Sequence, residues 1–348
     1  MKYKKLRLKT TTQALDYMGA IAMDLGLEGF EIEDNVPLTA EEKASMFIDI
    51  LPELPPDEGV AYVSFYVEPD TDEAELEGRL RDEAADYAGF CDFGEMSLEV
   101  SLTDENDWIN NWKEFFKPFR IDEQIVIKPT WEAYTPEEGH EGDLVIEIDP
   151  GTAFGTGAHE STKLCILALK KYLKGAERVL DIGCGSGILS IAALKLGAAF
   201  AVGIDVDRIA VDTSLENAEV NHINAVINDD LSDFKSITGE NVTDGNNGDA
   251  LRAVFSCGNV ISDESYAGKA AEIFRGGVDI VVANILADVI IPLSAVVPGM
   301  LKKGGVFISS GIINTKEEAV KEALKANGFE VAEVMRMNDW VSVIGTCK

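Results

Sequence analysis

The first hundred residues show two kinds of hydrophobic spacing. Apolar positions that alternate with polar ones predict strands, and apolar positions three to four residues apart predict helices. On this basis we expect strands at 3–8, 29–32, 60–67 and 96–102, and helices at 12–27 and 72–89. The order strand, helix, strand, strand, helix, strand is the ferredoxin-like arrangement. The sequence therefore predicts a small α+β domain over residues 1–104.

A regular alternation of strands and helices begins at Arg178. The expected strands are 178–182, 200–205, 253–256 and 279–283, the expected helices are 188–196 and 208–222, and strands near 124–128 and 144–148 precede them. This alternation, with one strand apolar enough to be buried on both faces, indicates a parallel sheet covered by helices. We therefore predict an α/β fold over residues 122–348, with a doubly wound, Rossmann-like sheet.

Two segments interrupt this organisation. Residues 105–121 contain a series of aromatic residues separated by charges (Trp108, Trp112, Phe115, Phe116 and Phe119). We interpret the segment as an interdomain linker helix, which Pro118 ends, and we favour packing of the aromatics between domains over a ligand-binding cage. Residues 226–251 are rich in Asn, Asp and Gly and therefore look like a surface insertion.

The composition is strongly acidic. The 348 residues include 62 Asp and Glu against 30 Lys and Arg, which gives a formal net charge of -32. Such a surface repels phosphate backbones and anionic membranes, so direct nucleic-acid binding is not expected. Residues 1–104 hold 25 acidic and eight basic residues, so this domain is the better candidate for attracting a Lys-rich protein. A surface that serves only solubility is the alternative.

Cysteine and histidine are sparse. The five cysteines and three histidines are scattered and contain no C-x-x-C pair, which argues against both a disulfide framework and a metal site. No apolar stretch follows the basic amino terminus, and polar residues and prolines interrupt the most apolar segment, 278–300. We expect a cytoplasmic monomer without a membrane span.

The strongest local signal is the glycine-rich run 181–187, Asp-Ile-Gly-Cys-Gly-Ser-Gly, at the end of a predicted strand. Glycines there let the backbone approach a ligand and leave N–H groups available at the start of a helix. A dinucleotide fingerprint requires a third glycine where Ile188 stands, which weakens a nicotinamide assignment. The pattern resembles the first motif of S-adenosylmethionine-dependent methyltransferases. A tight turn without a ligand is the alternative.

Polar residues end two other predicted strands. Asp205 lies 22 residues after Gly183, where a carboxylate can accept hydrogen bonds from both hydroxyls of a ribose, whereas Asp207 is better explained as a helix cap. Asn284 follows an apolar strand, and its side-chain oxygen can accept an N–H bond from an amine and so aim the nitrogen lone pair. Capping of the next helix is the alternative for Asn284.

The run 149–162, Asp-Pro-Gly-Thr-Ala-Phe-Gly-Thr-Gly-Ala-His-Glu-Ser-Thr, strongly resembles the signature loop of the ribosomal protein L-eleven methyltransferase family. The glycine run, Asp205 and the Asn-Ile-Leu-Ala run at 284–287 follow in that family's order. So do Trp-Lys-Glu-Phe-Phe-Lys-Pro at 112–118, Ser-Gly-Ile-Ile at 310–313, and Asp339-Trp340. The resemblance covers most of residues 105–348. Because of the segment at 226–251, the residue that contacts the adenine ring is not assigned.

The resemblance implies a methyltransferase that uses S-adenosylmethionine and acts on the large-subunit ribosomal protein L-eleven, free or on the ribosome. Thr162, Gly183, Asp205 and Asn284 match the family's cofactor-contacting positions. The amino-terminal domain corresponds to the family's substrate-recognition domain. The expected reaction is N-methylation of lysine side chains or of the N-terminal amine, and Asn284 is the expected catalytic residue.

An amine must be neutral before it can attack a methyl group. A free lysine has a pKa of about 10.4, and burial beside a cationic sulfonium lowers that pKa, so water is an adequate proton acceptor. His159 is either a general base or a water-exposed loop residue, and Trp340 can offer a π face to a methylammonium product. The competing functions are a methyltransferase of this fold that acts on another basic protein or on RNA, a nucleotide-dependent oxidoreductase, and a non-catalytic cofactor-binding module.

Overall fold

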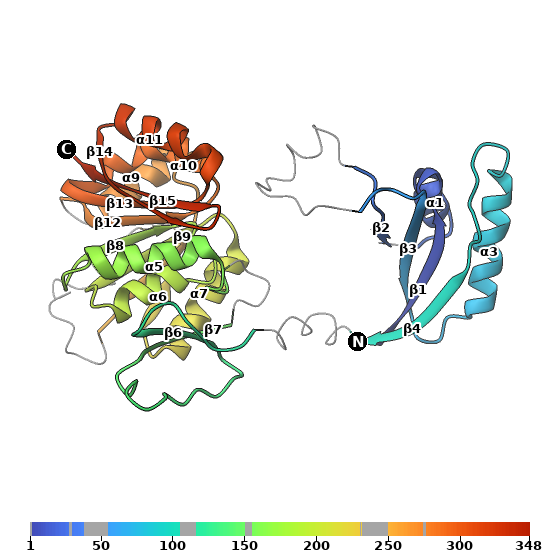
Figure 1. Cartoon of the computed structure of the whole chain (residues 1–348), viewed down its shortest axis with the longest axis horizontal. Coiled ribbons are helices and arrows are strands. Elements are labelled where there is room, and N and C mark those ends of the chain that lie inside the picture. Colours follow the sequence, from blue (N-terminus) through green and yellow to red (C-terminus); the bar gives the residue numbers. More distant parts are fainter. Residues whose placement is uncertain are drawn as a thin grey trace. The chain divides into compact units, whose positions relative to one another are not determined.

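The computed structural model describes residues 2–27, 30–37, 55–104, 116–149, 155–229, 231, 250–273 and 276–348. The chain divides into two compact units, Met1–Phe116 and Lys117–Lys348, here called the N-terminal and C-terminal units (Figure 1). No helix among the described residues is long and apolar enough to cross a membrane.

The N-terminal unit has the predicted order of elements. They are β1 (Lys2–Thr11), the 3-10 helix η1 (Thr12–Ala14), α1 (Leu15–Asp24), β2 (Phe30–Glu33), β3 (Val60–Val67), α3 (Glu73–Asp86) and β4 (Leu98–Asp104). The strands form one sheet in the order β2-β3-β1-β4, and all three pairings are antiparallel. This is the ferredoxin-like topology expected from the hydrophobic pattern.

Alternation along the strands decides which face of this sheet is buried. Leu6 and Leu8 of β1 and Phe65 of β3 pack in one cluster with Met18 of α1 and Leu80 of α3, and all five side chains are fully buried. Successive side chains of a strand point to opposite faces, so both helices cover the same face of the sheet.

The C-terminal unit begins with a small sheet of β5 (Phe119–Arg120), β6 (Ile125–Pro129) and β7 (Leu144–Ile148), in that order. Strand β6 pairs antiparallel with β5 and parallel with β7. The linker helix expected at 105–121 falls partly outside the described residues, which resume at Phe116. The described end of the segment is not helical, because residues 116–118 lie in neither a helix nor a strand and residues 119–120 form β5.

The remaining elements build an eight-stranded sheet and its helices. The strands are β8 (Arg178–Ile182), β9 (Phe200–Asp205), β10 (Ala225–Ile227), β11 (Ala253–Cys257), β12 (Val278–Asn284), β13 (Leu301–Ile313), β14 (Phe329–Met337) and β15 (Trp340–Cys347). The α-helices are α5 (Glu160–Tyr172), α6 (Ile188–Lys195), α7 (Arg208–Val220), α9 (Glu264–Glu272), α10 (Ala287–Val296) and α11 (Glu317–Ala326). Three short 3-10 helices complete the described chain: η1 above, η3 (Val297–Gly299) and η4 (Asn314–Lys316).

The strand order of this sheet is β10-β11-β9-β8-β12-β13-β15-β14. The pairs from β10 to β13 are parallel, and β15 runs antiparallel to both of its neighbours. Helices α5, α6 and α7 cover one face of the sheet, where α6 contacts both α5 and α7. Helices α9, α10 and α11 cover the other face and contribute side chains to the core there (Figure 1). The expected doubly wound, mostly parallel sheet is confirmed.

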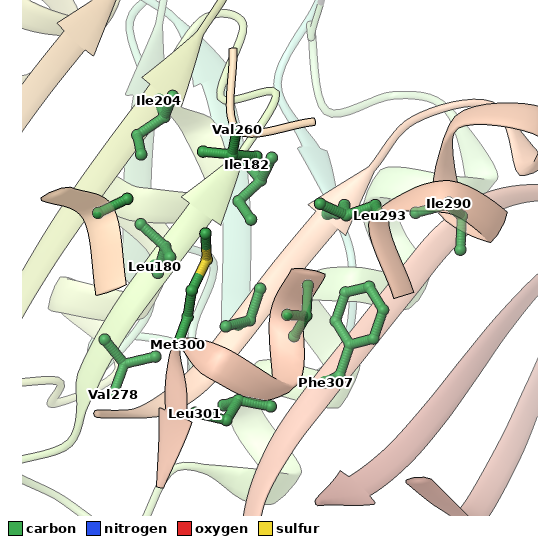
Figure 2. Packing of buried hydrophobic residues seen from close by; sticks show 14 of the residues in the cluster. Leu180, Ile182, Ile204, Val260, Val278, Ile290, Leu293, Met300, Leu301 and Phe307 are labelled. Carbon is green, nitrogen blue, oxygen red and sulfur yellow. The ribbon is translucent and has the colours of Figure 1, made fainter. Parts of the chain in front are cut away.

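Figure 2 shows the core on the side of α10. Leu180 and Ile204 come from the central strands, Ile290 and Leu293 from α10, and Phe307 from β13. All five are almost completely buried. A core continuous from β9 to β13 holds the ends of the central strands in fixed relative positions.

The prediction of a surface insertion at residues 226–251 is wrong at its first residues. The segment 226–251 does not begin as a surface loop, because Ala225–Ile227 form β10, which pairs with β11 at the edge of the sheet. A three-residue strand is too short to show a hydrophobic period, so the sequence could not reveal it. Most of the remaining segment lies outside the described residues.

Candidate active site

Three parallel strands at the centre of the large sheet end in the predicted polar or glycine residues. Strands β9, β8 and β12 are neighbours in that order, and Asp205, Gly183 and Asn284 lie at or directly after their carboxyl ends. The neighbour of β8 on one side is β9, the next strand along the chain, whereas its neighbour on the other side is β12, so the strand order reverses at β8. Ligands of doubly wound sheets bind at such a reversal of strand order, outside the carboxyl ends of the strands.

The turn after β8 depends on its glycines. Gly183, Gly185 and Gly187 all have positive φ angles, of 78°, 54° and 78°. A Cβ atom on Gly183 would lie 2.6 Å from Ile285 Cγ2, and one on Gly187 would lie 2.9 Å from Ser214 Oγ. The turn therefore excludes side chains both by conformation and by space, and its backbone remains close to the end of β12.

Asp205 is held in place by two backbone amides. Its Oδ2 accepts a hydrogen bond from the Gly185 N–H at 2.9 Å, and its Oδ1 accepts one from the Asp207 N–H at 3.0 Å. Asp207 caps α7 by accepting a bond from the Ile209 N–H at 2.9 Å, as the sequence predicts. The two carboxylates thus have different partners, and that of Asp205 joins β9 to the glycine turn.

Asn284 meets Thr162 from a distant part of the chain. Asn284 Nδ2 donates a hydrogen bond to Thr162 Oγ1 at 2.9 Å, and Thr162 is only 1% exposed. The carbonyl of its neighbour Ser161 accepts a bond from Ser310 Oγ, which ties the start of α5 to β13. The capping alternative for Asn284 is wrong, since Leu286 occupies the N-cap position of α10 and no side chain caps that helix.

His159 is more ordered than the sequence suggested. It is the N-cap of α5, and its Nδ1 accepts a hydrogen bond from the Ser161 N–H at 3.2 Å. Its ring packs edge-on against Trp340, with 4.5 Å between ring centroids, and burial lowers the pKa of the imidazole. A freely exposed loop histidine is therefore excluded. Histidine is not a common capping residue, so no sequence signal indicated this role.

A buried carboxyl lies beneath the glycine turn. Asp181 is fully buried, and its Oδ2 accepts hydrogen bonds from the Ser190 N–H (3.0 Å) and the Ser190 hydroxyl (2.8 Å). Its Oδ1 has no hydrogen-bond partner among the described residues. Burial raises the pKa of Asp181 to about 7. Asp181 opens the glycine-rich run, but no signal in the sequence assigns a role to it.

Asn217 connects the glycine turn to the segment before α5. Its Oδ1 accepts a bond from the Asp149 N–H (2.8 Å), and its Nδ2 donates to the carbonyls of Asp149 (3.0 Å) and Ser186 (2.9 Å). Ser186 Oγ in turn donates to the Gly155 carbonyl at 2.7 Å. Residues 150–154 of the signature run lie outside the described residues. Asn217 was missed because its partners lie on other elements.

Among the residues that the structure describes, no group of His, Cys, Asp and Glu side chains is arranged to hold a metal ion. The candidate site therefore consists of the glycine turn, Asp205, and the linked pair of Thr162 and Asn284.

The chain is similar to known proteins in sequence and in fold. The family model described as ribosomal protein L11 methyltransferase (PrmA) matches residues 2–246 and 252–348. A ribosomal protein L11 methyltransferase of Lachnoclostridium phytofermentans is 52% identical over 99% of this chain and 98% of its own length. One of Agathobacter rectalis is 46% identical over the same shares of the two chains. The crystal structure of a ribosomal protein L11 methylase from Lactobacillus delbrueckii subsp. bulgaricus matches with a TM-score of 0.53 and 26% identity, over 67% of this chain and 100% of that one.

The sheet has the Rossmann-like fold of S-adenosylmethionine-dependent methyltransferases, and the matches assign the chain to this class of enzyme. The matches to the ribosomal protein L11 methyltransferases extend over almost the whole sequence of this chain, including the N-terminal unit. The chain belongs to the ribosomal protein L11 methyltransferase family.

Proposed function

We propose that this enzyme transfers methyl groups from S-adenosylmethionine to amines of the large-subunit ribosomal protein L11. The acceptors are lysine side chains, the N-terminal amine, or both. The observation that carries the proposal is the hydrogen bond from Asn284 to Thr162, because it orients an amide at the carboxyl edge of the sheet beside the glycine turn. The names of the relatives support the choice of L11 as substrate.

The residues at the strand ends suit the cofactor. The turn has glycines at 183, 185 and 187 and therefore carries no Cβ atoms at these positions, so the cofactor can approach its backbone closely. Asp205 has two carboxylate oxygens, each with lone pairs beyond its one backbone bond, and so can also accept bonds from ribose hydroxyls. We assign cofactor binding to Gly183, Asp205, Thr162 and Asn284. When bound, S-adenosylmethionine supplies an electrophilic methyl group on a sulfonium ion.

Asn284 orients the acceptor nitrogen. Its Nδ2 is engaged by Thr162, so Oδ1 is the end that presents itself to an incoming N–H group. Most of the acceleration then comes from holding the neutral nitrogen in line at about 3 to 3.5 Å from the carbon it attacks. The ring of Trp340, at the start of β15, packs against His159 at the start of α5.

The acidity of the chain supports a basic protein as partner and disfavours direct contact with RNA. We place the reaction in the cytoplasm, with the enzyme acting as a monomer. Another basic protein, or RNA, is the alternative substrate of the same chemistry.

Intact-protein mass spectrometry tests the proposal. Unmodified L11 is incubated with the enzyme and S-adenosylmethionine, and Asn284→Ala is the comparison. We expect mass increases in whole methyl steps that depend on the cofactor and are much smaller with the variant. Cofactor binding by calorimetry without any mass increase would retain the class of enzyme and reject L11 as its substrate.

A further inference from the structure

His159 contacts the start of α5 through one ring nitrogen. The Ser161 N–H donates to Nδ1 at 3.2 Å, and the Ser161 hydroxyl oxygen lies 2.7 Å from the same nitrogen. A backbone N–H can only donate, so Nδ1 is unprotonated and the proton of the neutral ring is on Nε2. The nitrogen that is free to take up a proton therefore faces the helix, which does not suit a general base for the acceptor amine.

The first turn of α5 links this cap to the candidate site. Ser161 and Thr162 lie in that turn and are 2% and 1% exposed. The Ser161 carbonyl accepts a hydrogen bond from Ser310 Oγ at 3.0 Å, so Ser161 is held between His159 and β13. Thr162 follows directly and accepts the bond from Asn284. The cap therefore fixes the turn that presents the Thr162 hydroxyl to Asn284.

The surroundings of the ring favour its neutral form. The ring packs on Trp340, at the start of β15, with 71° between the two ring planes. Burial lowers the pKa of His159 below its ordinary value of 6.5, and of the two charged groups that act on it, Glu160 raises the pKa and Lys163 lowers it. A positive charge is also unfavourable at the N-terminus of a helix, where the macrodipole is positive. The ring is therefore neutral at physiological pH.

The turn before β15 contributes polar groups that have partners of their own. Asn338 Nδ2 donates to Glu160 Oε1 at 3.0 Å, and Asp339 Oδ1 accepts a bond from Asn314 Nδ2 at 3.1 Å. Residues 155–158, which precede the cap, include no titratable side chain. Both carboxylates are thus engaged elsewhere, and neither forms an ion pair with the imidazole.

We propose that His159 is a positioning residue for methyl transfer: in its neutral form, with the proton on Nε2, it caps α5 and holds Thr162 in place for Asn284 and the cofactor. A protonated ring carries N–H groups on both nitrogens, so Nδ1 no longer accepts the bond from Ser161. Acid therefore weakens both cofactor binding and turnover through the first turn of α5. This inference rests on the proposed function, since it takes Thr162 and Asn284 as residues of the site.

Nuclear magnetic resonance tests the protonation state of the ring without any substrate. The chain has three histidines, so long-range 1H–15N spectra of the full-length protein can resolve each ring, and His159→Asn identifies the signals of His159. We expect a neutral ring protonated on Nε2 at pH 8 and a pKa below the ordinary value of about 6.5. A ring protonated on Nδ1, or a pKa above the ordinary value, would contradict the proposal.

Two variants of the full-length enzyme test the cap. In His159→Asn the side-chain oxygen takes the position of Nδ1, and Asn is a preferred N-cap residue that does not titrate. In His159→Gln the amide lies one bond further from the backbone and the cap is lost. Both variants lose the ring contact with Trp340, so the difference between them reports the cap alone.

Turnover and cofactor binding are measured separately at pH 8. We expect His159→Gln to lower the kcat of L11 methylation about 10-fold and to raise the cofactor Kd about 3-fold, because Thr162 is displaced. His159→Asn should stay within about 2-fold of the wild type in both quantities, since the cap is kept.

The pH dependence is read from the ratio of the wild-type kcat to that of His159→Asn. This ratio should be constant above about pH 7 and should decrease below about pH 6, where only the wild type gains a proton at residue 159. The substrate amine and Asp181 titrate in both proteins, so their effects cancel in the ratio.

Asp72→Ala is the matched control, because Asp72 caps α3 in the N-terminal unit by accepting bonds from the Ala74 and Glu75 N–H groups. It should leave kcat and the cofactor Kd unchanged. If His159→Asn loses as much activity as His159→Gln, or if Asp72→Ala loses as much, the proposal is overturned. Cofactor Kd values and spectra as expected, without methylation of L11 by the wild type, would retain the role of His159 and reject L11 as the substrate.

Discussion

Asn284 and Thr162 are 122 residues apart in the sequence, yet the amide of one donates a hydrogen bond to the hydroxyl of the other at 2.9 Å. The bond joins the end of β12 to the first turn of α5. Because Nδ2 of Asn284 donates this bond, Oδ1 is the atom left to accept a hydrogen bond from the substrate amine. The proposed orientation of the amine by Asn284 depends on this arrangement.

Substitutions at this pair should act mainly on turnover. Asn284→Ala should lower kcat about 100-fold, because the nitrogen loses its alignment with the methyl group. Thr162→Val keeps the shape of the side chain but removes the hydroxyl that accepts the hydrogen bond from Asn284. It should lower kcat about 2- to 10-fold, as expected for the loss of one neutral hydrogen bond. Steady-state methylation of L11 measures both. Thr162→Ser should remain near wild type, and a higher KM with an unchanged kcat in Asn284→Ala would assign Asn284 to binding alone.

Asp205 and Asp207 offer a comparison of two neighbouring carboxylates. Asp205→Ala should raise the cofactor Kd about 10- to 100-fold, because bonds from ribose hydroxyls to a charged acceptor are lost. Asp207→Ala should leave that Kd unchanged and reduce stability by about 1 kcal/mol, since it removes the cap of α7. Calorimetry and thermal unfolding separate the two effects. Equal cofactor affinity in both variants would reject the ribose assignment.

Asn217 lies in the last turn of α7 and Asn221 is the C-cap residue of that helix, and the two are almost equally buried, at 1% and 6% exposed. Asn221 pairs with the backbone of Glu147 as Asn217 pairs with that of Asp149, but only Asn217 also bonds to Ser186 in the glycine turn. Each Asn→Ala variant should lose about 1 to 3 kcal/mol of stability.

Only Asn217→Ala should also raise the cofactor Kd, because the glycine turn loses a bond that positions it. The cofactor Kd values of Asn217→Ala and Asn221→Ala are compared by titration calorimetry at a temperature where both variants are folded. The milder variant Ser186→Ala, which removes only the bond to the Gly155 carbonyl, should leave the fold intact. A similar cofactor Kd for the two alanine variants would mean that Asn217 serves the fold alone.

Asp181 should make stability fall as pH rises. Burial raises its pKa from the usual 3.8 to about 7 in the folded protein. Between these two values the folded state holds a proton that the unfolded state has lost, so stability decreases with pH, by at most about 1.4 kcal/mol per unit. The decrease is complete above the folded pKa.

Asp181→Asn should remove this contribution. Denaturant unfolding from pH 4 to pH 8 should show the variant gaining stability relative to the wild type as pH rises. Other carboxylates, such as Glu33 and Glu317, have lowered pKa values and act in the opposite direction, so the difference between the two proteins is the relevant quantity. A difference that does not vary with pH would show that Asp181 stays charged, or stays protonated, throughout.

Local patterns predicted much of this protein. The period of apolar residues placed β3, β8 and β9 at their observed bounds, and the glycine run identified the turn after β8. These features depend on neighbours a few residues away, because alternation decides which face of a strand is buried and glycine permits positive φ angles. The strand ends that carry Asp205 and Asn284 could be found for the same reason.

The contacts between elements could not be predicted in this way. The bond of Asn284 to Thr162, the three bonds of Asn217, and the packing of His159 on Trp340 each join residues that lie far apart in the sequence. They exist because the order of the strands brings β8 and β12 together, and because α5 packs beside β12 and α7 beside β9. The sequence by itself thus determined the elements and the residue types at the site. Only the tertiary structure decided which side chains meet, since side-chain pairing depends on sheet order and helix packing rather than on local spacing.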